Sequence, residues 1–122
     1  MVVGSPGSAG TILTSSDGTS WTLRSVPQAA EQLYGISYGN STFVAVGDKA
    51  GDPSPLYTSS DGTTWTSRGF AADEHGHNGV TYMESIFLIV GLRGTIYTSS
   101  DGTTWTSRTS NTSNNLYGVT SR

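Results

Sequence analysis

The sequence predicts an all-β propeller built from four-stranded sheets, or blades, and three observations carry this prediction. An eleven-residue unit occurs three times in 122 residues, and the copies at 58–68 and 98–108 are identical. The copy at 14–24 differs from them at two positions. Successive copies begin 44 and 40 residues apart, and repeats of roughly 40–50 residues are typical of propeller blades. β-prone runs flank each copy, so we expect three blades per chain.

Each unit reads as a hairpin turn followed by an aromatic anchor. In Ser-Asp-Gly-Thr, the Asp side chain can accept hydrogen bonds from amides two or three residues on, and Gly adopts positive φ without strain. We assign the turn residues a structural role: Asp17, Gly18, Asp61, Gly62, Asp101 and Gly102. A buried indole covers about 200 Å². The Trp four residues after each Asp is therefore a predicted core residue: Trp21, Trp65 and Trp105.

These units resemble the Asp-box, the bacterial neuraminidase repeat, whose pattern is Ser-x-Asp-x-Gly-x-x-Trp. Here the first copy reads Ser15-Ser-Asp17-Gly18-Thr-Ser-Trp21, and the same spacing recurs at 59–65 and 99–105. One residue between Asp and Gly is missing, so this is a compact variant. The resemblance implies a folding element that joins the third and fourth strands of a blade, on the face away from that family's active site. It implies no activity.

The other strands follow in chain order. Inner strands are expected at 33–38, 77–82 and 115–120, and second strands at 1–4, 42–46 and 86–90. Third strands are expected at 11–14, 56–58 and 95–98, and the fourth strands carry the Trp residues. The second strands are continuous apolar runs, which are typical of strands covered on both faces.

The two ends of the chain predict an open ring. Residues 1–4 match the second strand at 44–47, and residues 115–122 match the inner strand at 32–39. One unit, 1–122, therefore divides into blades at 1–32, 33–76 and 77–114, with 115–122 completing another blade. Known propellers use about four or more blades. We expect a head-to-tail homodimer or homotrimer with six or nine blades, six being favoured by association entropy. The predicted closure residues are Met1, Val2, Val3, Leu116, Tyr117 and Val119.

Composition limits the partners. A net charge of −3 with six Lys and Arg residues argues against nucleic acid, and no apolar run approaches the ~20 residues of a membrane span. The first residues read directly as a strand, so no signal peptide is expected. With no Cys there are no disulfides or thiolate metal ligands, and the compartment stays open. No cofactor is expected.

The connections that differ between repeats are the expected place for a ligand, because binding residues concentrate on loops held by a rigid scaffold. The candidate ligand-binding residues are Asp48, Lys49, Asp52, Asp73, Glu74, His75, His77 and Arg93. A His-x-His pair without a third ligand is a weak metal motif, and no metal site is predicted. The Tyr residues occupy repeat-equivalent positions and are assigned to the scaffold.

Three Arg residues, one after each Trp, allow two interpretations: Arg24, Arg68 and Arg108. They could form a ring of guanidinium groups for carboxylates or sulfates. We favour outer-strand residues that lie along the neighbouring blade.

Three functions remain open. The first is a non-catalytic, lectin-like binding module with a glycan as partner. The second is a scaffold, or a fragment or engineered propeller building block with no dedicated ligand. The third is a glycosidase-like enzyme, which would need two carboxylates about 5–10 Å apart, and no such pair is recognisable. We therefore expect no enzyme.

Overall fold

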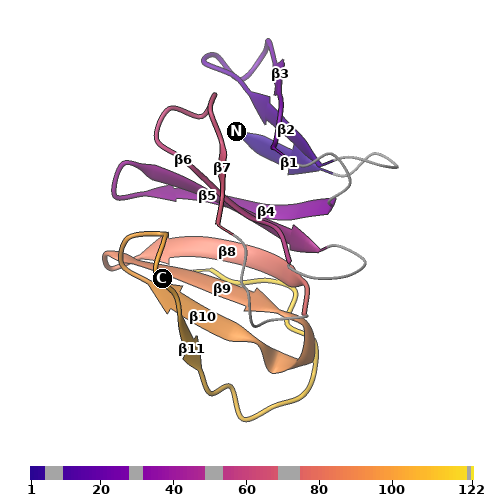
Figure 1. Cartoon of the computed structure of the whole chain (residues 1–122), viewed down its shortest axis with the longest axis vertical. Helices are drawn as coiled ribbons and strands as arrows, with labels where there is room; N and C mark the ends of the chain where they lie inside the picture. Colours follow the sequence, from indigo (N-terminus) through magenta and orange to yellow (C-terminus); the bar gives the residue numbers. More distant parts are fainter. Residues whose placement is uncertain (5–9, 28–31, 49–53, 69–74, 121) are drawn as a thin grey trace.

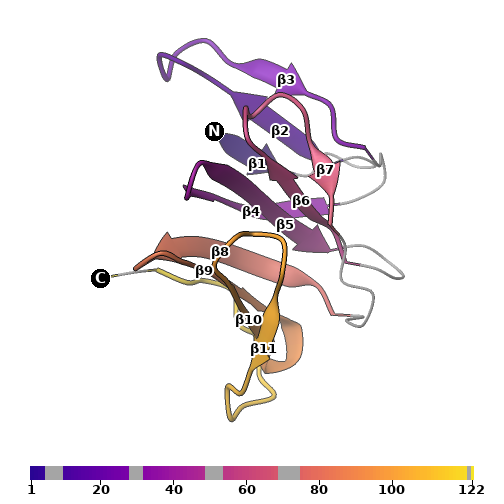
Figure 2. The same ribbon diagram turned by 60° about the vertical axis from the view of Figure 1, so that its left-hand side comes forward.

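The structure is a computed structural model that describes residues 1–4, 10–27, 32–48, 54–68, 75–120 and 122. The described residues form three antiparallel sheets that lie side by side, and no α-helix (Figures 1 and 2). This confirms the predicted all-β fold.

Each sheet is a meander whose neighbouring strands follow one another in the chain. Blade 1 contains β1 (Val2–Gly4), β2 (Thr11–Thr14) and β3 (Thr22–Arg24). Blade 2 contains β4 (Gln32–Gly39), β5 (Thr42–Asp48), β6 (Leu56–Ser59) and β7 (Thr66–Ser67). Blade 3 contains β8 (His77–Met83), β9 (Ile86–Gly91), β10 (Ile96–Ser99) and β11 (Thr106–Arg108), with a 3₁₀ turn, η1 (Leu92–Gly94), after β9. Blades 2 and 3 have four strands, and blade 1 has three because its sheet begins at the second strand.

The core consists of two apolar layers, one between each pair of adjacent blades. The layer between blades 1 and 2 is Ile12, Leu33, Ala45, Tyr57 and Trp65. The layer between blades 2 and 3 is Val44, Val46, Leu56, Val80, Phe87 and Ile89. β5 contributes alternate residues to both layers, because its two faces are each covered by a neighbouring blade. This explains why its sequence is a continuous apolar run.

The inner strands of adjacent blades approach so closely that glycine is required. A Cβ on Gly35 in β4 would lie 3.2 Å from the Cα of Gly79 in β8. The ladders β4–β5 and β8–β9 share an irregularity at the same place, between Leu33 and Gly35 and between His77 and Gly79. Repeat-equivalent residues therefore have the same local geometry.

The two ends of the blades carry different connections. Asn40, in the β4–β5 turn, donates from Nδ2 to the carbonyl of Ser100, in the β10–β11 turn, at 3.4 Å. The hairpin turns and the Asp-Gly turns thus lie at one end, on the left in Figure 1, which we call the turn face. The opposite end, where β4 and β8 begin and β5 and β9 finish, is called the loop face.

The predicted inner strand at 115–120 is not a strand in the structure. It lies instead against β8: the Leu116 amide donates to the Gly91 carbonyl at 2.9 Å, and Asn78 Nδ2 donates to the Leu116 carbonyl at 2.8 Å. A Cβ on Gly79 would lie 3.3 Å from the Tyr117 carbonyl oxygen. We call residues 115–120 the tail. The tail packs against β8 in the same way that β8 packs against β4. Among the described residues no strand pairs with the tail.

Two further predictions need correction. The fourth strands begin one residue after the Trp and do not include it. Trp65 is buried, Trp105 is half-buried, and Trp21 is 43% exposed. Trp65 and Trp105 each pack towards the preceding blade, whereas no described blade covers Trp21.

Candidate functional site

The three Asp-Gly turns share one hydrogen-bond pattern. Asp61 Oδ1 accepts from the amides of Thr63 and Thr64, both at 2.8 Å, and from the Ser59 hydroxyl at 3.0 Å. Gly62, at φ +74°, closes the turn. The same contacts occur around Asp17 and Asp101. The three carboxylates thus act as turn acceptors.

These hydrogen bonds stabilise the charged form of each Asp. The amides of Thr104 and Thr103 and the Ser99 hydroxyl lower the pKa of Asp101 to about 2. Equivalent amides and a Ser hydroxyl lower the pKa of Asp17 and of Asp61. All three are therefore anions at neutral pH.

A pocket of about 410 Å³ lies at the loop face, where a ligand was expected. Its lining residues come from β4 and β8, the end of β5, the 3₁₀ turn η1 and the tail: Tyr34, Asp48, Asn78, Leu92 and Tyr117. It combines two aromatic rings with a carboxylate and an amide, which suits a ligand that has an apolar face and a polar rim.

The strand irregularity positions three of these residues. Tyr34 and Asn78 lie inside the two register shifts of β4 and β8, and Tyr117 is their equivalent in the tail. At such a bulge the extra residue is left out of the ladder and its side chain is turned to a new direction. Tyr34 is 46% exposed and Tyr117 is 69% exposed.

The structure places some of the predicted ligand-binding residues at this pocket and others elsewhere. Asp48 lines the pocket and packs over Gly76, where a Cβ would collide with its carboxyl group. Arg93 is next to the pocket residue Leu92, and its amide donates to Asn115 Oδ1 at 3.0 Å. His75 accepts a hydrogen bond from Ser54 through its backbone carbonyl, at 2.7 Å.

His77 is fully buried, with its ring edge-on to Tyr97 at a centroid distance of 5.9 Å. It occupies the position of Leu33 in blade 2 and belongs to the core, so it is not available to a surface ligand. The remaining predicted residues, Lys49, Asp52, Asp73 and Glu74, lie outside the described residues.

Sequence reasoning missed Tyr34, Asn78 and Tyr117. The two Tyr residues had been assigned to the scaffold because they are repeat-equivalent. The signal that could have identified them is their place directly before the repeated Gly of each inner strand. In β4 and β8 this place is where the register shift occurs.

The described part of the chain contains no group of three His, Cys, Asp or Glu side chains that could hold a metal ion. Within the same residues, no helix has the length and apolar character needed to cross a membrane.

The open end of blade 1 is a second candidate site. β1 pairs only with β2, although β5 and β9 each pair with strands on both sides. Val2 is 44% exposed and Trp21 43% exposed, whereas their equivalents in blade 2, Ala45 and Trp65, are buried. An apolar face and an unextended strand edge therefore meet at this end of the molecule.

Comparison with known proteins supports the fold. No family model and no curated protein matches the sequence. Among solved structures, YCF48 bound to D1 peptide matches with a TM-score of 0.65 and 17% sequence identity. The match covers 83% of this chain and 34% of that one, so the chain spans about a third of that structure's length. This likeness shows a propeller-type fold and nothing of the ligand.

Proposed function

We propose that the protein is a non-catalytic propeller module that assembles from identical chains and binds its ligand at the loop face. In this proposal the tail of one copy becomes the inner strand that pairs with β1 of another. The observation that carries it is the sheet order: blades 2 and 3 continue inward to β4 and β8, and blade 1 stops at β1.

The repeat supplies the register of the intermolecular ladder. In blade 2, Leu33 pairs with Gly47, Gly35 with Val46 and Ile36 with Ala45. Between two copies, the equivalent pairs would be Leu116 with Gly4, Gly118 with Val3, and Val119 with Val2. The bulge then falls at Tyr117, as it falls at Tyr34 and Asn78.

The exposed face of blade 1 supports the same arrangement. Val2 and Trp21 would be covered by blade 3 of the second copy, as Ala45 and Trp65 are covered by blade 1. Stacking of repeats buries faces that a single repeat leaves in water, and an unpaired strand edge is a template for pairing. Closure removes both features at once.

Gly4 offers a sharp test. A Cβ on Gly47 would collide with the Gln32 carbonyl and one on Gly91 with the Gly76 carbonyl, whereas a Cβ on Gly4 has nothing within 4 Å. Gly4→Val therefore fits the single chain, but in the ring it meets the carbonyl of Asn115 from the second copy. We expect sedimentation velocity to show assembled wild type and a folded, monomeric variant.

A matched control is Leu23→Ser. Leu23 is 67% exposed, and the other two copies of the repeat have Ser at this position. This variant should assemble normally. Unchanged assembly of Gly4→Val would show that β1 is not the closing strand.

The loop-face pocket is the proposed ligand site, with a glycan as the candidate ligand because aromatic rings stack on sugar faces. Tyr34→Ala and Tyr117→Ala should each weaken binding on a glycan array. Absence of binding by the wild type would favour the alternative, a building block with no dedicated ligand. Turnover of a fluorogenic glycoside would contradict the non-catalytic assignment.

A further inference from the structure

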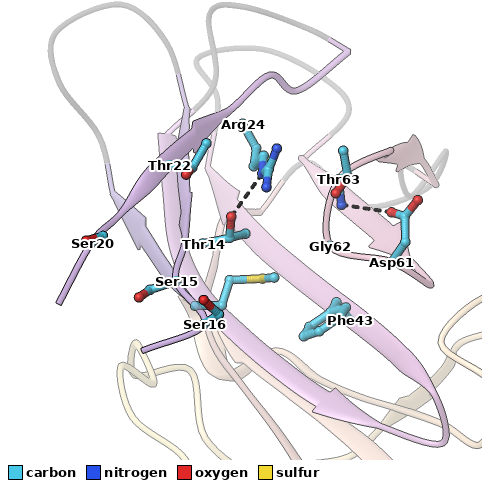
Figure 3. A pocket seen from close by; sticks show the side chains of 11 residues that line it. Thr14, Ser15, Ser16, Ser20, Thr22, Arg24, Phe43, Asp61, Gly62 and Thr63 are labelled. Carbon is cyan, nitrogen blue, oxygen red and sulfur yellow. Dashed lines mark hydrogen bonds between the residues drawn. The ribbon is translucent and has the colours of Figure 1, made fainter. Parts of the chain in front are cut away.

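A second set of pockets lies on the turn face, between adjacent blades. The first, of about 410 Å³, is lined by five Ser and Thr residues and Arg24 from blade 1, and by the Asp61–Thr63 turn of blade 2 (Figure 3). Met1 and Phe43 add apolar surface to its lining. The loop-face site uses none of these residues.

The pocket repeats along the chain. The second copy, of about 260 Å³, combines Arg68 and the hydroxyl groups of blade 2 with Asp101 and Thr103 of blade 3. The third, of about 250 Å³, has Arg108 and the hydroxyl groups of blade 3, and no following turn. Equivalent positions of the repeat therefore build the same pocket wherever a next blade is present.

A hydrogen bond within the blade fixes each guanidinium group. Arg24 Nε donates to Thr14 Oγ1 at 2.9 Å, and Arg68 Nε donates to Thr58 Oγ1 at 3.0 Å. The Arg108–Thr98 pair has the same bond at 2.8 Å. In the described structure the terminal nitrogens of these Arg side chains have no protein acceptor.

The next blade supplies the acceptor. Asp61 and Asp101 use Oδ1 for the turn, and within the described residues no donor reaches Oδ2 of either side chain. Each complete pocket thus holds oriented donors on one wall and a fixed acceptor on the other, with hydroxyl groups between them.

We propose that these inter-blade pockets bind uncharged, hydroxyl-rich ligands, that is, sugar rings. A sugar ring carries several hydroxyl groups, so one can accept from the guanidinium group while another donates to the carboxylate. An anion would be attracted by the Arg side chain but repelled by the neighbouring Asp. A cation would be attracted by the Asp side chain but repelled by the Arg. The pairing of the two charges therefore selects a neutral polyol.

The third pocket is incomplete in one chain. The turn equivalent to Asp61–Thr63 is 17–19 of blade 1, and in a closed ring a second copy would place it beside Arg108. A single chain then offers two complete pockets, and each chain of a ring offers three. The first two sites do not depend on assembly.

The test is a ¹⁵N NMR titration of the intact chain with methyl glycosides of glucose, galactose and mannose, with sulfate and N-acetylneuraminate as anionic comparators. We expect a neutral glycoside to shift the amide signals of Thr63 and Thr103 and the Nε–H signals of Arg24 and Arg68. In Asp61→Asn and Asp101→Asn the amide oxygen can still accept the hydrogen bonds of the turn. The amide NH₂ group then takes the place of Oδ2, so that a donor replaces an acceptor. Each should weaken binding at its own pocket about ten-fold and leave binding at the other pocket unchanged.

The matched control is Tyr117→Ala, which alters the loop face and should leave these shifts unchanged. Loss of the shifts in Tyr117→Ala alone would place the sugar at the loop face and overturn this inference, leaving the proposed function intact. Shifts caused only by the anions, or by no ligand, would also overturn it. Conversely, two pockets binding sugar in a monomeric chain would support this inference and contradict ring closure.

Discussion

At the residue scale, one oxygen atom organises each turn. Oδ1 of Asp17, Asp61 or Asp101 receives two amides and a Ser hydroxyl, and the following Gly takes the positive φ that the turn requires. This explains why the Asp-Gly unit is repeated without change while the loop-face connections vary.

Acid should weaken the fold through these carboxylates. Because the folded-state pKa of Asp101 is lowered from 3.8 to about 2, its contribution to stability is fully present above pH 3.8 and is lost as the pH falls towards 2. Asp17 and Asp61 are shifted in the same direction. Urea denaturation across this range should show falling stability in the wild type and a shallower fall in Asp101→Asn. Identical pH slopes would contradict the role of the charge.

The Trp residues should differ in their contribution to stability although their repeat positions are equivalent. Trp65 is buried and donates from Nε1 to the Gly62 carbonyl at 3.3 Å, so Trp65→Ala should lower the free energy of unfolding by about 3–5 kcal/mol. Trp21→Ala, measured in the monomeric Gly4→Val background, should lower it much less, because Trp21 is 43% exposed there. Equal losses in urea denaturation would show that Trp21 is packed within its own chain.

At the element scale, most strands can be predicted from the sequence because the chain contains three similar repeats that fold alike and can be compared with one another. The expected strand at 11–14 is β2, and the expected strands at 42–46 and 86–90 are extended by one or two residues in β5 and β9. These predictions succeed because turn chemistry and apolar runs are local properties.

The features that could not be predicted depend on neighbouring blades. The bulge at Tyr34 adjoins the close approach of Gly35 to Gly79, a contact between residues 44 positions apart. Trp21 is exposed because no described blade packs on it. The turn-face pockets need Arg68 and Asp101, which lie on different repeats. Periodicity within one segment contains no information about such contacts.

The tail should be separable from the rest of the fold. Its described hydrogen bonds to β8 and η1 are few, and the strands of all three sheets end before residue 109. Deletion of 115–122 should therefore leave the β-sheet circular dichroism unchanged and abolish assembly. A synthetic peptide of the deleted residues should bind the truncated chain by adding a strand to β1. Assembly that persists after truncation would exclude the tail as the closing element.

At the scale of the whole molecule, three blades stack in the order of the chain and present two unlike ends. Blade 1 offers Trp21 and the edge of β1, and blade 3 offers the tail and the outer face of β9 with 42%-exposed Ile86. In the proposed assembly these unlike ends would meet head to tail, a contact that closes into a ring when the rotation between copies is suitable. The repeat geometry, and not a dedicated interface, would set the number of chains.

The mass of the wild-type chain in solution tests ring closure most directly. With a chain mass of 12.8 kDa, multi-angle light scattering should give a concentration-independent species of about 26 kDa for two chains or about 38 kDa for three. A single species of 12.8 kDa across the accessible concentrations would contradict closure between copies.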